Sequence, residues 1–266
     1  MGERTLIMGV LNVTPDSFSD GGKYADPDRA FARALEMEEQ GADIIDVGAE
    51  STRPGSARIT AAEEMRRLVP VLKRLQGRLS IPVSVDTYKA EVAERALELG
   101  AEIINDPSAL TWEPQLARTV SNFDAGLVLN HMRGRPETWM KLAPIPDPMG
   151  TISRDLGAAV SRARRVGIDK SRMVIDPGLG FGKRKEQNLF IIGHLQQLQE
   201  LDLPILAGPS RKHFLSTAED LDKKFATAAA VVACILGGAH MIRVHDVREM
   251  RTAADMADEI NRAQSE

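Results

Sequence analysis

Short apolar runs recur along the chain, and longer stretches with helical spacing of apolar positions separate them. Each run is almost purely aliphatic and does not alternate with polar residues. That pattern is typical of parallel strands that are buried on both faces. It predicts eight strands, at residues 6–11, 44–47, 82–85, 102–105, 126–130, 173–175, 204–207 and 240–244.

The stretches between these runs predict helices. In residues 61–75, for example, the apolar side chains recur three and four positions apart, so they share one face of a helix. Glycine follows several of these stretches, as expected of a helix C-cap. Helices are expected at residues 28–40, 61–75, 88–99, 153–166, 225–236 and 247–262.

The repeated strand–helix rhythm over 266 residues predicts an α/β protein with a (β/α)8 TIM barrel. The alternative is an open, doubly wound sheet. No dinucleotide fingerprint follows the first strand, which favours the barrel. No linker rich in proline, serine or glycine divides the chain, so residues 1–266 are expected to form one domain.

Composition narrows the class of partner. A net charge of -4 and only 4% aromatic residues argue against nucleic-acid binding. No apolar run approaches the roughly 20 residues that a membrane-spanning helix needs. The first strand begins close to the N-terminus, and the lone Cys234 cannot form an internal disulfide. These features predict a cytoplasmic protein that binds small molecules and neither nucleic acid nor membrane.

Polar residues follow every predicted strand. An isolated Asp or Asn at such a place, such as Asp46 or Asp246, is more often a turn former or a helix cap. Eight polar endings in succession instead indicate a shared pocket, because the carboxyl ends of barrel strands converge on one mouth. These endings begin at Asn12, Glu50, Asp86, Asn105, Asn130, Asp176, Gly208 and Arg243.

The residue types in this pocket suit a flat, polar ring. Asp86 and Asp176 supply carboxylates that accept N–H groups, and Asn105 supplies an amide that both donates and accepts. A buried polar edge left without a partner costs about 1–3 kcal/mol per group, so such a set selects strongly for a complementary heterocycle.

A second group of residues suits an anion. Lys212, Arg243 and His245 follow or belong to the last two strands, where barrels commonly hold phosphate, and their positive charge favours a phosphate ligand. Asn12 offers an oxygen to Mg²⁺, whose other ligands would be phosphate oxygens and water.

Other motifs are less informative. Residues 178–183 are rich in glycine but lack the Walker spacing, so we expect a tight turn that lets the backbone approach a flat ligand. His131, His240 and Cys234 do not have the spacing of a zinc site. No nucleophile elbow of a serine hydrolase is present.

Taken together, the motifs resemble those of the dihydropteroate synthases, in the same order and over nearly the whole chain. The matching strings are N-V-T-P-D-S-F-S-D-G-G from Asn12, E-S-T-R-P-G from Glu50, V-D-T-Y-K-A from Val85, I-N-D from Ile104, H-M-R-G from His131, D-P-G-L-G-F-G-K from Asp176, S-R-K from Ser210 and R-V-H-D from Arg243. The first, second and last strings are specific.

The resemblance implies the reaction of 6-hydroxymethyl-7,8-dihydropterin diphosphate with p-aminobenzoate, which gives 7,8-dihydropteroate and pyrophosphate and uses Mg²⁺. It also implies a homodimer, a sulfonamide target and a dissociative mechanism, in which pyrophosphate leaves before the arylamine attacks. The helix at residues 225–236 is a candidate for the dimer interface.

The same resemblance implies residue roles. Lys212, Asp86, Asp176 and Arg243 would be catalytic, and Asn12 would be the metal ligand. The pterin would be held by Asp86, Asn105, Asp176 and Lys212, and the diphosphate by Thr52, Arg243 and His245. The p-aminobenzoate pocket would be shaped by Phe18, Arg53, Pro54 and the segment after Lys212. Further substrate-binding residues are expected at Met132, Phe181, Gly208 and Ser210.

The chain departs from the family pattern at Pro107, His213 and Ser216. Pro107 lacks a backbone donor beside a predicted pterin ligand. Two alternatives would share the barrel and the Asp and Asn residues that bind pterin. One is a methyltransferase that uses a methylated folate, and the other is a pterin-binding protein without turnover. A methyltransferase does not account for the loop from Asn12 together with the S-R-K and R-V-H segments, whereas the protein without turnover stays open.

Overall fold

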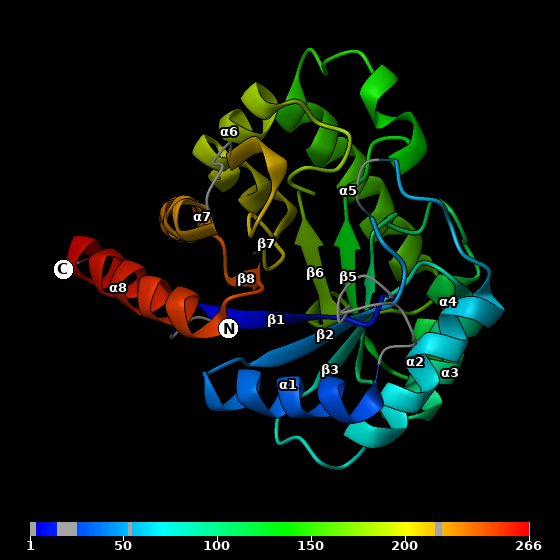
Figure 1. The fold of residues 1–266 in the computed structure, drawn as a ribbon. Helices are drawn as coiled ribbons and strands as arrows, with labels where there is room; N and C mark the ends of the chain where they lie inside the picture. Colours follow the sequence, from blue (N-terminus) through cyan, green and yellow to red (C-terminus); the bar gives the residue numbers. More distant parts are fainter. Residues whose placement is uncertain (1–3, 15–25, 53–54, 216–219, 266) are drawn as a thin grey trace.

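Eight parallel strands form a ring that is surrounded by helices (Figure 1). The computed structural model describes residues 4–14, 26–52, 55–215 and 220–265. Phe18, Arg53, Pro54 and Ser216 lie outside the described residues. The strands are β1 (Leu6–Asn12), β2 (Ile44–Gly48), β3 (Val83–Asp86), β4 (Ile103–Asp106), β5 (Gly126–Asn130), β6 (Met173–Asp176), β7 (Leu206–Ala207) and β8 (Met241–Val244).

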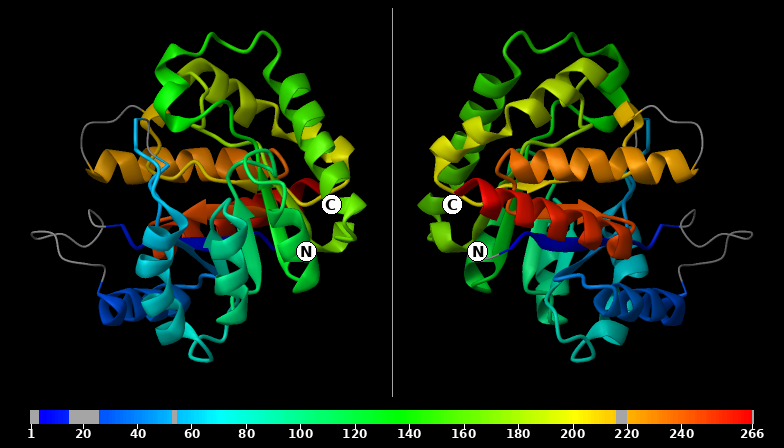
Figure 2. Two further views of the ribbon diagram at one scale, coloured as in Figure 1. Left: turned by 90° about the vertical axis from the view of Figure 1, so that its right-hand side faces the viewer. Right: turned by 90° about the vertical axis from the view of Figure 1, so that its left-hand side faces the viewer.

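Helices cover the outside of the ring, as the two opposite views in Figure 2 show. The α-helices are α1 (Pro27–Glu39), α2 (Ala61–Leu75), α3 (Ala90–Glu98), α4 (Leu116–Asn122), α5 (Pro148–Arg165), α6 (Lys185–Gly193), α7 (Asp220–Leu236) and α8 (Val247–Ser265). Short 3₁₀ helices are η1 (Pro136–Lys141), η2 (Lys170–Arg172), η3 (Leu195–Leu201) and η4 (His213–Leu215). No helix within the described ranges is both long and apolar enough to span a bilayer.

The ring is closed, which confirms the predicted barrel and excludes the open sheet. Each strand pairs in parallel with its neighbours in the order β6-β5-β4-β3-β2-β1-β8-β7. An isolated parallel bridge between Ile175 and Ile205 joins the two ends of this order. The Ile175 backbone N–H also donates to the Pro204 carbonyl at 2.9 Å. The pairing between β6 and β7 therefore involves fewer paired residues than the other strand pairings.

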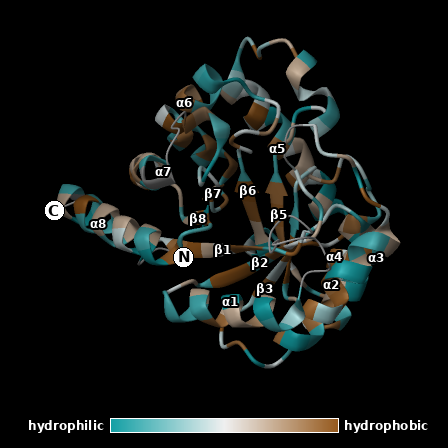
Figure 3. Ribbon diagram, viewed as in Figure 1, coloured by the Kyte–Doolittle hydropathy of each residue, from teal (hydrophilic) through white to brown (hydrophobic). Residues whose placement is uncertain are grey.

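The core has two layers, because successive residues of a strand face opposite sides. One cluster fills the interior of the barrel, and a larger cluster packs the strands against the helices. Figure 3 shows the strands as mostly hydrophobic. The interior cluster is formed by Met8, Ile44, Val128, Val174, Leu206 and Met241. Two residues further along, at the next inward positions of β2, β5, β6 and β8, the side chains are polar, and this change places the site at the mouth. They are Asp46, Asn130, Asp176 and Arg243.

Some element boundaries differ from the prediction, for local reasons. Helix α5 begins at Pro148, earlier than expected, because the Asp147 side chain caps it by accepting from the Gly150 N–H at 3.0 Å and proline suits the first helical position. Strand β7 is shorter than expected, since Pro204 has no N–H for a strand ladder. Helices α4 and α6 were not predicted: α4 is short, and the apolar residues of α6 are consecutive rather than spaced along one face.

Candidate active site

The barrel mouth gathers the predicted polar residues from five strands. Asp86 and Asp176 are the last residues of β3 and β6, and Asn105 lies within β4 beside Asp86 in the strand register. Arg243 comes from β8, and Lys212 follows β7. The structure therefore brings Asp86, Asn105, Asp176, Lys212 and Arg243 to one end of the barrel.

Arg243 is fixed by two carboxylates across the mouth. Its Nε donates to Asp46 at 2.6 Å and its Nη2 donates to Asp86 at 2.8 Å. These carboxylates raise the pKa of Arg243 despite its burial, so the guanidinium stays charged. Asp46 is fully buried and also accepts from the Ser84 hydroxyl at 2.7 Å and from Asn105 Nδ2 at 3.1 Å.

Asp46 is thus a central residue that sequence reasoning missed. It was interpreted as a cap or turn former, yet it lies inside β2 and joins three neighbouring side chains. The available signal was a carboxylate within an otherwise aliphatic strand, since a buried charge requires partners.

The two predicted pterin carboxylates lie where ionisation is costly. Burial raises the pKa of Asp86 to about 7, although the charge of Arg243 acts in the opposite direction. Burial also raises the pKa of Asp176, against the Gly178 N–H, which donates to it at 2.6 Å, and against the charge of Lys212. N–H donors on a ligand would stabilise the ionised form of both carboxylates.

Lys212 is a cation in a largely desolvated position. Burial lowers its pKa to about 8, and the charge of Arg243 acts in the same direction, while Asp176 and Asp86 oppose the shift. Its Nζ lies 3.9 Å from the centre of the Phe181 ring. The loop that carries Phe181 therefore contacts Lys212 directly.

The glycine-rich loop at residues 178–183 forms a tight turn. Gly178 has φ +67°, and a Cβ there would lie 1.9 Å from the carbonyl oxygen of His131, so only glycine fits. The buried Lys183 Nζ donates to the carbonyls of Gly178 at 2.8 Å and His131 at 3.1 Å. Burial lowers the pKa of Lys183 to about 7. The loop is thereby tied to the end of β5.

Ser210 and His245 form a second polar pair at the mouth. The Ser210 hydroxyl lies 3.0 Å from His245 Nδ1 and accepts from the His245 backbone N–H at 3.2 Å. Burial lowers the pKa of His245 to about 3, and the charge of Arg243 adds to this effect. His245 is therefore neutral at pH 7, in contrast to the positive charge that we expected from the sequence.

Oxygen atoms suitable for a metal lie beside Gly48, where the missing side chain leaves space. From the point that a Cβ of Gly48 would occupy, Asp86 Oδ2 is 3.7 Å away and Asn12 Oδ1 is 3.8 Å away. Among the described residues, no group of three or more His, Cys, Asp or Glu could hold a metal ion. Asp86 Oδ2 already accepts from Arg243, so Asn12 Oδ1 is the donor that fits a Mg²⁺ with its other ligands from phosphate and water.

The loop after β2 carries the predicted Thr52 and is anchored by buried charges. Lys89 Nζ lies 2.6 Å from Glu50 and also contacts Glu64. The Glu50 carboxylate additionally accepts from the Ile59 N–H at 3.1 Å, which closes the base of the loop. The sequence did not indicate this cluster, because its members lie on three separate segments.

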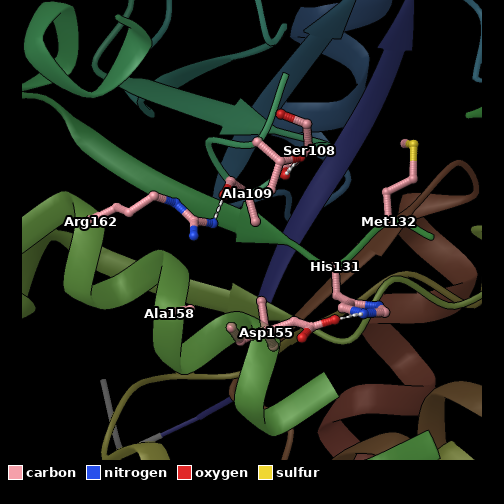
Figure 4. Close-up of a pocket in the computed structure, with 9 residues that line it drawn as sticks. Ser108, Ala109, His131, Met132, Asp155, Ala158 and Arg162 are labelled. Atoms are coloured by element: carbon pink, nitrogen blue, oxygen red, sulfur yellow. Dashed lines mark hydrogen bonds and ion pairs between the residues drawn. The ribbon is translucent and has the colours of Figure 1, made fainter. Parts of the chain in front are cut away.

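The remaining predicted residues lie around the rim. Gly208 follows β7, and a Cβ at this position would lie 3.7 Å from Arg243 Cβ, while His213 begins η4. Met132 lines a cavity of about 180 Å³ between the loop after β4, the end of β5 and α5. Figure 4 shows His131 facing Asp155 in this cavity, with Nε2 and Oδ2 3.4 Å apart, and Arg162 reaching the Ala109 carbonyl.

The fold and the site together define a class. A closed parallel barrel that presents carboxylates, an amide and cations at its mouth is suited to a polar heterocycle with an anionic substituent. The family described as Pterin binding enzyme matches residues 8–245, which include this mouth.

Individual relatives narrow that class. The chain is 40% identical to a dihydropteroate synthase of Synechocystis over 261 residues, which cover 97% of this chain and 90% of the relative. A Clostridium difficile dihydropteroate synthase solved with pteroic acid superposes with a TM-score of 0.91 at 42% identity, covering 97% of both chains. A Xanthomonas albilineans dihydropteroate synthase in complex with 7,8-dihydropteroate gives 0.86 at 36%, covering 97% of this chain and 94% of that one. The chain belongs to the dihydropteroate synthase family.

Proposed function

We propose that this protein condenses 6-hydroxymethyl-7,8-dihydropterin diphosphate with p-aminobenzoate to form 7,8-dihydropteroate and pyrophosphate in folate biosynthesis. The family membership over nearly the whole chain supports this reaction. The single observation that carries it is the meeting of Asp86, Asn105, Asp176, Lys212 and Arg243 at one mouth. Relatives that hold pteroic acid and 7,8-dihydropteroate support the substrate class.

We propose that the pterin ring lies among Asp86, Asn105 and Asp176. Their acceptor atoms would receive the ring N–H groups, and Lys212 would donate to a ring acceptor from the opposite side. In a dissociative reaction positive charge develops on the pterin as pyrophosphate departs. Two carboxylates held in a desolvated mouth would stabilise that charge without reorganisation.

The departing diphosphate would lie on the side of Arg243. The two bonds of Arg243 to Asp46 and Asp86 hold the guanidinium in one orientation. The neutral His245 would donate an N–H to a phosphate oxygen, and Thr52 would contribute a hydroxyl from the loop after β2. Asn12 would hold Mg²⁺, which when bound neutralises charge on the leaving group.

The reaction is tested by incubating the protein with both substrates and Mg²⁺ and measuring pyrophosphate and dihydropteroate. We expect both products, in equal amounts, only when p-aminobenzoate and Mg²⁺ are present. Methyl transfer from a methylated folate without pyrophosphate release would favour the methyltransferase alternative. Pterin binding by calorimetry with no product in any condition would favour a protein without turnover.

We also propose a homodimer formed through α6, α7 and α8. Large apolar side chains are exposed on these consecutive helices, among them Phe190, Phe225 and Met256. Phe225 is 66% exposed, which is costly for an isolated aromatic ring in water. Helices α7 and α8 lie side by side, so their exposed residues are available to the same partner surface (Figure 1).

A further inference from the structure

Asn130 occupies an inward-facing position at the mouth of the barrel. It is the last residue of β5 and pairs in register with Asp176 of β6. Val128, two residues earlier in the same strand, belongs to the interior cluster. Because side chains of a strand alternate, Asn130 faces the same interior one level higher. It lies on the strand between those that carry Asn105 and Asp176.

One end of the Asn130 amide is paired and the other is not. Its Nδ2 donates to the Pro107 carbonyl at 2.9 Å, and this bond fixes the orientation of the amide, since an oxygen could not bond there. Asn130 is only 3% exposed, yet its Oδ1 is buried without a hydrogen-bond partner among the described residues. A buried acceptor in this state is costly, so it requires an explanation.

Three donors near Asn130 in the described part of the chain are already engaged. The Gly178 N–H donates to Asp176, and the His131 N–H donates to the Asp176 carbonyl. Lys183 Nζ directs its three hydrogens to backbone carbonyls of the neighbouring loops. The unpaired Oδ1 lies 3.2 Å from the point where a Gly178 side chain would begin, so a side chain at this position would crowd it. A ligand in the mouth would supply the missing donor.

We propose that Asn130 is a specificity-determining residue that accepts a hydrogen bond from an N–H of the pterin ring. This inference rests on the proposed function. Strands β4, β5 and β6 then present an amide, an amide and a carboxylate in a row toward one edge of a flat ring. A ring that lacks an N–H at this place would leave the Asn130 oxygen unpaired and would bind more weakly.

The test compares Asn130→Leu, which keeps the approximate size and removes the acceptor, with Asn130→Asp, which restores an acceptor oxygen. Calorimetry with 6-hydroxymethyl-7,8-dihydropterin measures binding without turnover. We expect Kd to rise roughly tenfold or more in Asn130→Leu, with partial recovery in Asn130→Asp. In turnover assays the KM for the pterin diphosphate should rise, whereas the KM for p-aminobenzoate should not change.

Thermal unfolding of both variants separates binding from folding. Loss of the bond to Pro107 lowers the melting temperature of Asn130→Leu whatever the role of Oδ1. An unchanged pterin Kd in a folded Asn130→Leu would overturn the inference and would assign the oxygen to a bound water. If the wild type binds pterin but forms no dihydropteroate, the proposed reaction fails, while a weakened Kd in Asn130→Leu still supports the inference.

Discussion

Arg243 illustrates how the charges at the mouth depend on one another. Its side chain neutralises Asp46 and orients Asp86, so its positive charge is already partly compensated before phosphate binds. The net charge that a diphosphate encounters comes from Arg243, Lys212 and the two carboxylates together. Changes at any one of them therefore alter the protonation of the others.

Removing a charge that we propose to contact the pterin should strongly slow the reaction. We expect Lys212→Ala and Asp176→Asn each to lower kcat/KM about a hundredfold or more, since a preorganised charge is lost from a desolvated site. Steady-state kinetics of purified variants measures this, with Lys141→Ala on η1 as a control. Near-normal rates in both variants would refute the assigned roles.

The pH dependence should reflect the same residues. Asp86 must be ionised to accept, so activity should fall as pH drops below about 7. Lys212 must be protonated to donate, so activity should fall as pH rises above about 8. The plot of kcat/KM against pH should thus be bell-shaped, with both limbs belonging to the coupled groups.

Lys212→Arg is the control for this profile, because arginine stays charged over the accessible range and substrate ionisation is unaffected. We expect the basic limb to move to higher pH in this variant even if the maximum rate is reduced. An identical basic limb in both proteins would assign it to the substrate or to another residue.

At the scale of single elements, the buried Lys89 should be important for stability. It neutralises Glu50 and Glu64, which join the loop after β2 to α2 and α3. Lys89→Met leaves two buried carboxylates without their cation, and we expect a loss of about 3 kcal/mol in the free energy of unfolding. Urea denaturation of the wild type and the variant measures this difference in the free energy of unfolding.

Arg95→Met provides the matched comparison on α3, because Arg95 pairs with Glu98 on an exposed surface. An exposed pair of this kind contributes about 0–1 kcal/mol. Equal effects of the two substitutions would show that the Lys89 cluster does not anchor the loop.

Most elements could be predicted from the sequence, because aliphatic runs and helical spacing report directly on burial. The last residues of such runs, including Asp86 and Asp176, were predicted as mouth residues for the same reason. Asp46 was not, because its partner Arg243 lies 197 positions away and no local pattern encodes that pairing. The lowered pKa of His245 likewise arises from burial and from charges that other strands contribute.

On the scale of the whole molecule, the apolar surface of α6, α7 and α8 should control assembly. We expect the wild type to sediment as a dimer and Phe225→Asp combined with Met256→Asp to sediment as a monomer, since a charge would be buried in the interface. Analytical ultracentrifugation at several concentrations distinguishes the two states.

Met140→Asp is the control for that experiment, because Met140 is 89% exposed on η1, on a different part of the barrel. It should leave the sedimentation coefficient unchanged. A wild-type protein that sediments as a monomer at every concentration would disprove the proposed interface.

The weak junction between β6 and β7 has a consequence for ligand response. Asp176 ends one of these strands and Lys212 follows the other, so a pterin bound to both residues, as proposed, would connect the two strands. Occupancy would then add a cross-link where the backbone provides only one isolated bridge. The substrate itself would therefore stabilise the barrel. Amide hydrogen exchange near Ile175 and Ile205 should slow when the pterin binds.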